Sequence, residues 1–364
     1  MSSYPSSSRA RMRVRLACTA LAVVCAGALS ACGPGGPKPK TADDDGNGGD
    51  TGPSRGITLL AGSATTTGSR DDKGSKATFN TPRGIVIDTG GNLFVADELN
   101  RVIRKIMPDG TVMTFAGVVG NKQGSANGNG TGARFTDPTA LAIDASDNLY
   151  VLDNYQIRKI TPSAVVTTLV TLQSSPLGDN LRLHPAGIAI DSSGNLFITT
   201  GVDTRRLSGA QYQNSTTLEG PVNDSLDSVL VPRGIAVDTS GAAYLADLNN
   251  TISRVTADAT SLTRFAGVQG GGSADGNINQ AGFRQVVALT VAKDGTLYAA
   301  DAQSNTIRKI TTNAVTSTVA GRVGGTTLVP GGLTNSLANV AGITVDANGV
   351  LYVTSGNAVV KIVL

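Results

Sequence analysis

The sequence contains no tryptophan and one histidine, His184, among 364 residues. Because large aromatic rings are scarce, a hydrophobic core has to be built from Val, Ile, Leu and Ala, which suits thin β-sheets packed face to face. One histidine cannot provide a histidine-ligated metal cluster. No Ser-His-Asp, Cys-His or phosphate-loop arrangement is present either. The sequence therefore predicts no catalytic residue, no metal ligand and no cofactor.

Cysteine is confined to the N-terminal region, at Cys18, Cys25 and Cys32. The rest of the chain is therefore expected to fold without a disulfide, even in a compartment that permits one. The formal net charge of +3 depends on four arginines that precede residue 32. The residues beyond them hold 26 Lys and Arg against 27 Asp and Glu, a net charge of −1. A nearly neutral body argues against non-specific binding of nucleic acid.

What the sequence does contain is a repeating unit of four short β-branched runs, first at residues 82–88, 92–97, 100–106 and 111–115. Gly, Asn and Asp separate the runs, and this pattern predicts consecutive antiparallel strands joined by tight turns. The residue that closes the first strand recurs every 47–56 residues, at Asp88, Asp144, Asp191, Asp238, Ala292 and Asp346. Periods of this length with four strands per repeat are typical of a β-propeller.

The number of blades follows from a missing strand. The sixth repeat reaches Leu364 directly after its third strand, whereas residues 56–62 precede the first repeat and resemble the fourth strands at 111–117 and 318–321. A strand at about 57–61 is therefore expected to complete blade six, which protects its third strand from being an unpaired edge. The prediction is an all-β, six-bladed propeller of four-stranded antiparallel blades over residues 56–364.

The N-terminal region is expected to lie outside the fold. Four arginines precede an apolar run, and Leu29-Ser-Ala-Cys32 resembles a bacterial lipobox. We interpret residues 1–31 as a lipoprotein signal peptide, with Met1 or Met12 as the start, and Cys32 as the lipidated residue. An ordinary secretory signal is the alternative. Residues 32–55, rich in Gly, Pro, Asp and Lys, are predicted to form a disordered tether.

The repeat units resemble NHL repeats, which would cover essentially all of residues 56–364. The resemblance rests on Pro-x-Gly-Ile-x-Val/Ile-Asp, Gly-Asn-Leu-x-Val-Ala-Asp and Asn-x-x-Ile-Arg-Lys-Ile, seen together between 82 and 106. It implies the propeller fold, but the family includes RNA-binding regulators, kinase sensor domains, lyases and scaffolds, so it does not specify a function. A weak third repeat and Ala292 in place of aspartate depart from the pattern.

Strand order places the long loops, 62–81, 117–137, 267–285 and 321–340, on one face of the ring and tight Asp/Gly/Asn turns on the other. Phe79, Phe135 and Phe283 end three of these loops and are expected to anchor them. Third-strand arginines are expected to form framework ion pairs with second-strand aspartates; these are Arg104 with Asp97, Arg158 with Asp153, and Arg308 with Asp301.

Arg83 and Arg233 occupy the same position, just before the first strand, in blades one and four. These blades are diametrically opposed in a six-bladed ring. The two arginines are therefore candidates to flank the channel mouth and hold a carboxylate or phosphate. The alternative is that each arginine pairs locally with an acidic neighbour.

Taken together, these features predict a monomeric, lipid-anchored, extracytoplasmic binding or scaffold propeller whose long-loop face recognises a protein, peptide or glycan. The expected location is the cell envelope, at the outer membrane or facing the periplasm in a diderm, and on the outer face of the plasma membrane in a monoderm. A propeller enzyme resembling lyases or lactonases, with a site at the channel mouth, is the alternative. Two convergent carboxylates in a pocket there would favour the enzyme, and a shallow polar surface would favour binding.

Overall fold

Each repeat forms one four-stranded antiparallel sheet, because its apolar residues alternate along short β-branched segments that end in turn-forming residues. In the computed structural model, the described residues are 54–364 except 121–122, 173–185, 201–202 and 219–231. The predicted signal peptide, Cys32, nearly all of the tether and His184 lie outside this range. None of the described helices is long and apolar enough to cross a membrane.

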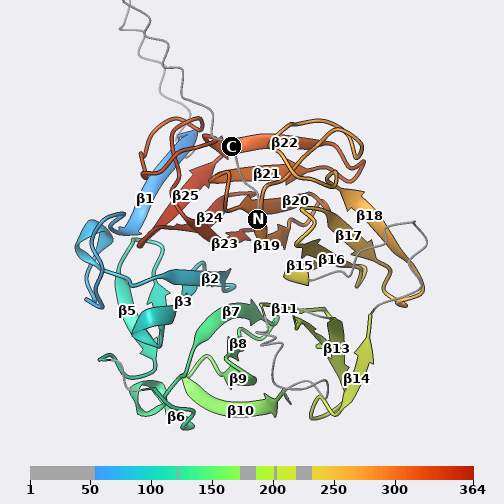
Figure 1. The fold of residues 1–364 in the computed structure, drawn as a ribbon. Helices are drawn as coiled ribbons and strands as arrows, with labels where there is room; N and C mark the ends of the chain where they lie inside the picture. The colour runs from blue at the N-terminus through green and yellow to red at the C-terminus, as the bar shows by residue number, and fades with distance from the viewer. Residues whose placement is uncertain (1–53, 121–122, 173–185, 201–202, 219–231) are drawn as a thin grey trace, which may run out of the picture. The chain divides into compact units, whose positions relative to one another are not determined.

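Six such sheets are present (Figure 1), which confirms the predicted all-β propeller. Blade 1 contains β2 (Pro82–Ile87), β3 (Leu93–Asp97), β4 (Val102–Ile106) and β5 (Val112–Ala116). Blade 2 contains β7 (Pro138–Ile143), β8 (Leu149–Asp153), β9 (Gln156–Ile160) and β10 (Val165–Thr171), with the short β6 (Gly128–Asn129) added to its outer edge. Blade 3 contains β11 (Gly187–Ile190), β12 (Leu196–Thr199), β13 (Thr204–Ser208) and β14 (Asn214–Thr217).

The remaining blades have the same order. Blade 4 contains β15 (Pro232–Val237), β16 (Ala243–Asp247), β17 (Ile252–Val255) and β18 (Leu262–Ala266). Blade 5 contains β19 (Val286–Val291), β20 (Leu297–Asp301), β21 (Thr306–Ile310) and β22 (Thr316–Gly321). Blade 6 contains β23 (Val340–Val345), β24 (Leu351–Ser355), β25 (Ala358–Val363) and β1 (Gly56–Gly62). The described parts of the loops contain three short 3₁₀ turns, η1 (Gly74–Lys76), η2 (Glu98–Asn100) and η3 (Gly130–Gly132).

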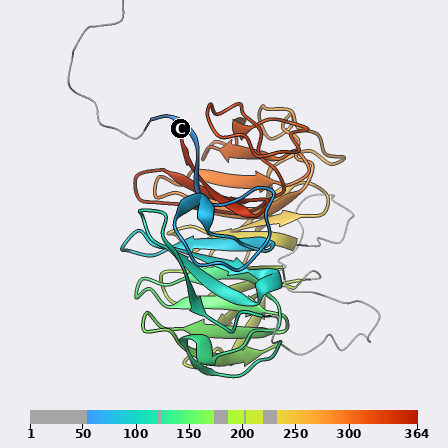
Figure 2. The same ribbon diagram turned by 90° about the vertical axis from the view of Figure 1, so that its left-hand side faces the viewer.

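Strand β1 closes the ring by pairing with β25, as the sequence predicted. The pairing is antiparallel from Gly56 opposite Val363 to Gly62 opposite Ala358, with one irregularity between Leu59 and Ala61. The blue N-terminal strand and the red C-terminal strand lie side by side in both ribbon views (Figures 1 and 2). The first strands of neighbouring blades contact one another all the way round, including β2 with β23.

The hydrophobic core lies between blades. One buried cluster, for example, joins Phe94 and Ile103 of blade 1 to Leu141 and Val151 of blade 2. Each blade therefore buries its two faces against its two neighbours, which explains why a core without tryptophan suffices.

Buried arginines attach the long loops to their blades, and Arg104 shows how. Its guanidinium is fully buried and donates to Asp97 at 2.9 Å, to the Thr78 carbonyl at 2.9 Å and to Asp71 at 2.7 Å. The same group lies over the ring of Phe79, 5.0 Å from its centroid, and that ring is itself fully buried. Strand and loop are thus joined by ion pairs, a backbone hydrogen bond and a cation–π contact.

The arrangement repeats in blades 2 and 5, which confirms both the predicted ion pairs and the predicted phenylalanine anchors. Arg158 lies 3.1 Å from Asp153 and over Phe135. Arg308 lies 2.8 Å from the loop residue Asp275, 3.9 Å from Asp301 and over Phe283.

Candidate functional site

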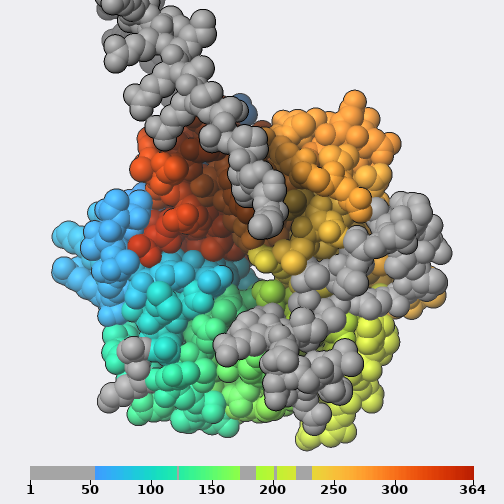
Figure 3. All heavy atoms as spheres, in the orientation of Figure 1, coloured from blue at the N-terminus to red at the C-terminus, as the bar shows by residue number. Residues whose placement is uncertain are grey.

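The cavity at the centre of the ring is lined by the first strand of every blade. It has a volume of about 1230 Å³. Its walls include Ile85, Leu141, Ile235 and Ile343, and the space-filling view shows the surface hollowed where the blades meet (Figure 3). The rim is formed by two sets of residues. One set lies directly before the first strands, such as Thr81, and the other lies between second and third strands, such as Glu98. The cavity therefore opens on the face that carries the long loops.

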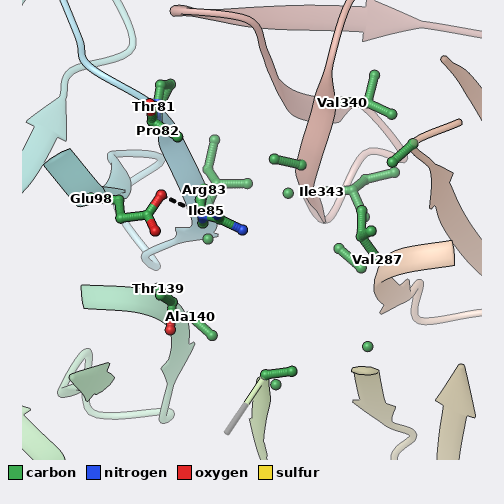
Figure 4. Close-up of a pocket in the computed structure, with 18 of the residues that line it drawn as sticks. Thr81, Pro82, Arg83, Ile85, Glu98, Thr139, Ala140, Val287, Val340 and Ile343 are labelled. Carbon is green, nitrogen blue, oxygen red and sulfur yellow. Dashed lines mark hydrogen bonds and ion pairs between the residues drawn. The ribbon is translucent and has the colours of Figure 1, made fainter. Parts of the chain in front are cut away.

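The structure brings the two candidate arginines, Arg83 and Arg233, to this one cavity. Arg83 follows Pro82 in β2, and its side chain is half exposed. Its Nε donates to the carboxylate of Glu98, which begins η2 (Figure 4). Arg83 therefore has the local acidic partner that the alternative interpretation expected.

Arg233 occupies the matching position in β15 of blade 4. Among the residues that the structure describes, no ion pair involves its side chain. Its backbone carbonyl accepts a hydrogen bond from the Thr199 hydroxyl at 2.8 Å, which ties blade 4 to blade 3. Its backbone is thus fixed, and the residue lines the cavity without an ionic partner for its side chain in the described range.

Asp137 is a charged rim residue that sequence reasoning missed. Its backbone N–H donates to Asp153 at 2.7 Å, and its carbonyl accepts from the Asn154 N–H at 3.0 Å. Burial raises the pKa of the Asp153 carboxyl. Hydrogen bonds from Asp137 and Thr136 and the charge of Arg158 lower this pKa and offset part of the effect of burial. The structure records no partner for the Asp137 side chain in the described residues. Asp137 directly precedes the proline that begins a first strand, as Thr81 does, and this position in the repeat could have indicated that it lies at the rim.

The cavity is not symmetric. On blades 1 and 2 its lining includes the polar side chains of Arg83, Glu98 and Thr139, whereas blades 5 and 6 contribute Val287 and Ile343 on the other side (Figure 4). Three residues with amide side chains, Gln285, Asn339 and Asn357, also line the cavity on this side. No aromatic or histidine side chain is found among the described residues that line the cavity.

The part of the chain that the structure describes contains no group of three or more His, Cys, Asp or Glu side chains that could hold a metal ion. The charged residues of the described cavity lining are Arg83, Glu98, Asp137 and Arg233. Two carboxylates, Glu98 and Asp137, line it, and Glu98 is turned toward Arg83. The site is thus a pocket, as expected for an enzyme, and not the shallow polar surface expected for binding, but one of its two carboxylates is paired with Arg83.

No protein-family model matches the chain. Teneurin-1 from Gallus gallus is 38% identical over 97 residues, which is 25% of this chain and 4% of that protein. The chain thus spans a very small part of this relative, and the similarity extends over about two repeats.

Solved propellers resemble the whole ring. An auxiliary nutrient-binding protein from Bacteroides thetaiotaomicron is 16% identical with a TM-score of 0.64, covering 85% of this chain and 76% of that one. A catalytically inactive histidine-to-alanine variant of virginiamycin B lyase from Staphylococcus aureus, solved with quinupristin, is 16% identical with a TM-score of 0.53. The match covers 85% of this chain and 99% of that one. A gluconolactonase from Xanthomonas campestris is 12% identical with a TM-score of 0.55, and the match covers 84% of this chain and 88% of that one. At these identities the likeness shows the fold, which serves both binding proteins and enzymes.

Proposed function

We propose that this chain is an NHL-repeat propeller lipoprotein that binds a protein, peptide or glycan ligand at the mouth of its central channel. The observation that carries the proposal is the open cavity of about 1230 Å³ on the long-loop face, whose lining includes Asp137 and Arg233, two charged residues without side-chain partners among the described residues. Charged side chains held on a rigid backbone and left unpaired in a concave site are a common basis of ligand recognition.

The likeness to a nutrient-binding protein supports a binding role for the same fold. Arg83 and Arg233 are proposed as ligand contacts. Arg83 would exchange part of its interaction with Glu98 for the ligand, and Arg233 would supply a planar donor pair to an anionic group.

Anchoring at the cell envelope is proposed from the sequence of the first 55 residues. Residues 1–31 would direct export, Cys32 would carry the lipid, and residues 32–55 would tether the propeller, which starts at residue 56. The roughly 24-residue tether would span about 25–30 Å if flexible, so the cavity could turn freely above the membrane.

The binding proposal is tested by photo-crosslinking from the cavity rim in intact bacteria that express the full chain. A benzophenone amino acid is placed at Gln285, which lines the cavity, and in a matched strain at Asn348, in the tight turn between β23 and β24. We expect a discrete adduct from position 285 alone, and its loss when Arg83→Gln and Arg233→Gln are combined. The same adducts from both positions, or none from either, would contradict the proposal.

Anchoring is tested separately by metabolic labelling with an alkyne-tagged palmitate. The full chain is expected to incorporate the label and to sediment with membranes. Cys32→Ser should lose both properties, whereas Cys25→Ser, which changes a cysteine inside the predicted signal, should retain lipidation. A labelled Cys32→Ser chain would show that the lipid is attached elsewhere.

An enzyme remains the second candidate because two carboxylates, Glu98 and Asp137, line the same cavity. The lyase that shares the fold is inactive when one histidine is replaced by alanine, and this chain has only His184, outside the described residues. A lyase or lactonase here would therefore use the carboxylates as acid and base. Turnover of a sugar lactone or a cyclic depsipeptide by the full chain, abolished in Asp137→Asn, would establish this alternative.

A further inference from the structure

We infer that the cavity binds a short zwitterionic peptide, with the peptide's ammonium group beside Asp137 and its carboxylate beside Arg233. The inference rests on the proposed function and gives a chemical class to its ligand. Three observations support it: the charges of the rim, the apolar wall opposite, and the absence of aromatic rings from the described lining.

The rim charges form a dipole across the mouth. Among the described lining residues of blades 1 and 2, Arg83 and Glu98 neutralise each other, so Asp137 gives that side a net negative charge. On blade 4, Arg233 is positive, and blade 3 separates the two. Because unlike charges in a partly enclosed site interact more strongly than in water, a ligand with one charge of each sign at its ends gains from both.

The wall formed by blades 5 and 6 suits aliphatic side chains. Val287 and Ala341 lie at the rim, and Ile343 lies deeper. Burial of aliphatic groups there contributes roughly 25 cal/mol for each Å² removed from water. A peptide of small apolar residues offers such groups between its charged ends, whereas a purely ionic ligand leaves this wall exposed.

The lack of aromatic side chains in the described cavity lining favours peptides over nucleotides and glycans. Nucleobases bind proteins by stacking their flat faces on aromatic side chains. Sugar rings pack their C–H faces against aromatic side chains in the same way. None of the described lining residues is aromatic. A ligand that relies on stacking therefore finds no partner in this part of the cavity.

The test uses the full-length chain in detergent micelles and isothermal titration calorimetry. The probes are peptides of two to five alanine and valine residues with free ends, each also made with an acetylated N-terminus or an amidated C-terminus. We expect binding by free peptides, with one preferred length that reports the span from Asp137 to Arg233. Each end modification should weaken binding about tenfold, because it removes a charge-assisted hydrogen bond.

Two isosteric variants assign each end of the peptide to a residue. Asp137→Asn should weaken the free peptide about tenfold and leave the acetylated peptide unchanged, and Arg233→Gln should do the same for the amidated peptide. Arg206→Gln serves as the control, because Arg206 lies in β13 and donates to Ala257 near the opposite, tight-turn face. It should leave every affinity unchanged.

The inference fails if free, acetylated and amidated peptides bind equally, or if either substitution acts equally on free and modified peptides. It also fails if no peptide binds while oligosaccharides do. Failure of the broader proposal is distinguishable, because crosslinking from Gln285 would then capture nothing either. Rim crosslinking without peptide binding would leave the binding role in place and remove the zwitterionic ligand.

Discussion

Buried arginines such as Arg158 combine a full charge with complete exclusion from water. The guanidinium donates to Asp153 at 3.1 Å, to the Arg134 carbonyl at 3.0 Å and to the Asn127 side chain at 3.1 Å. Its Nε has no hydrogen-bond partner among the described residues, and the same is true of Arg104 and Arg308. The phenylalanine ring below each guanidinium offsets part of that cost. Removal of such a group leaves a carboxylate buried without a counter-charge.

We therefore expect Arg158→Met to lower the free energy of unfolding by about 3–5 kcal/mol. The matched control is Arg205→Met, since Arg205 pairs with Asp203 in a partly exposed site and its loss should cost about 1 kcal/mol or less. Urea denaturation of both variants measures the difference. Equal losses would show that burial of the Arg158 pair contributes nothing specific.

In blade 4, Ser253 stands where blades 1, 2 and 5 have the buried arginine, so Asp247 is buried without an arginine partner among the described residues. It accepts hydrogen bonds from the Thr251 hydroxyl at 2.7 Å and from the Thr251 and Asn249 N–H groups. Burial nevertheless raises the pKa of Asp247 above its ordinary value of 3.8. The native state then binds this proton more tightly than the unfolded chain, and stability falls as pH rises from about 4 through the native pKa.

Because asparagine does not titrate, the stability of Asp247→Asn relative to the natural chain should improve between pH 4 and pH 7. Asp258→Asn should show the opposite trend, because hydrogen bonds from Thr256 and Thr260 lower the pKa of Asp258. The natural Asp258 stabilises the fold above pH 3.8, and that contribution is lost as pH falls. Thermal melts from about pH 2 to pH 7 measure both trends, because the contribution of Asp258 changes below about pH 4 and that of Asp247 changes above it. Two parallel profiles would refute the assignment.

At the scale of the element, β1 decides whether blade 6 is complete. Ile57 exchanges backbone hydrogen bonds with Gly331 on the outer side of the strand, at 2.7 and 2.8 Å. Since successive N–H groups of a strand point to opposite edges, Thr58 directs its N–H toward Lys361 of β25. Both edges of β1 are therefore occupied, one by the loop and one by the last strand.

Thr58→Pro removes a ladder hydrogen bond from the closing pair and is expected to lower stability by about 1–3 kcal/mol. Thr58→Ala removes only the side chain and should cost much less. Chemical denaturation measures both, and size-exclusion chromatography should detect self-association of the proline variant through the weakened edge. Equal behaviour of the two variants would mean that this hydrogen bond does not support closure.

Strand pattern made most of the fold predictable. Alternation within each repeat, the turn residues and the orphan strand at 57–61 gave six blades and their closure, and all are confirmed. Blade 3 was harder, because every residue of β14 is exposed and so the segment lacks the apolar alternation that marks a strand. The structure nevertheless pairs β13 with both β12 and β14, so this blade is complete.

The cavity was less predictable than the fold. The shared position of Arg83 and Arg233 follows from the repeat, so sequence placed both at the mouth. The contact between Arg83 and Glu98 depends on how η2 turns after β3, which periodicity does not encode. Asp137 resembled an ordinary turn residue before a proline, and its position at the rim depends on the backbone hydrogen bonds to Asp153 and Asn154.

At the scale of the molecule, closure by β1 means that one blade is assembled from segments about 300 residues apart. This can be tested with two circular permutants that share one linker from Leu364 to Gly56. One is opened at 271–272, in the loop between blades 4 and 5, so that no blade combines distant segments. The other is opened at 294–295, in the turn between β19 and β20, so that blade 5 joins both new ends.

We expect the permutant opened in the loop to melt at least about 4 °C lower, equivalent to about 1–2 kcal/mol, because its ring is held shut by face packing alone. The permutant opened in the turn retains a hydrogen-bonded seam and should melt close to the natural chain. Differential scanning calorimetry decides between them. Identical melting temperatures would show that strand exchange adds nothing to packing between blades.

The position of Gly56 has a mechanical consequence. Gly56 lies opposite Val363 at the end of β1, so tension that enters the propeller from residue 55 is applied first to the pair joining the two ends of the ring. If the chain is held at a membrane while its cavity holds a ligand, load passes through β1 before it reaches any other strand. A ring stretched in this way would open at blade 6, and a ligand bound across the channel would then be released by force.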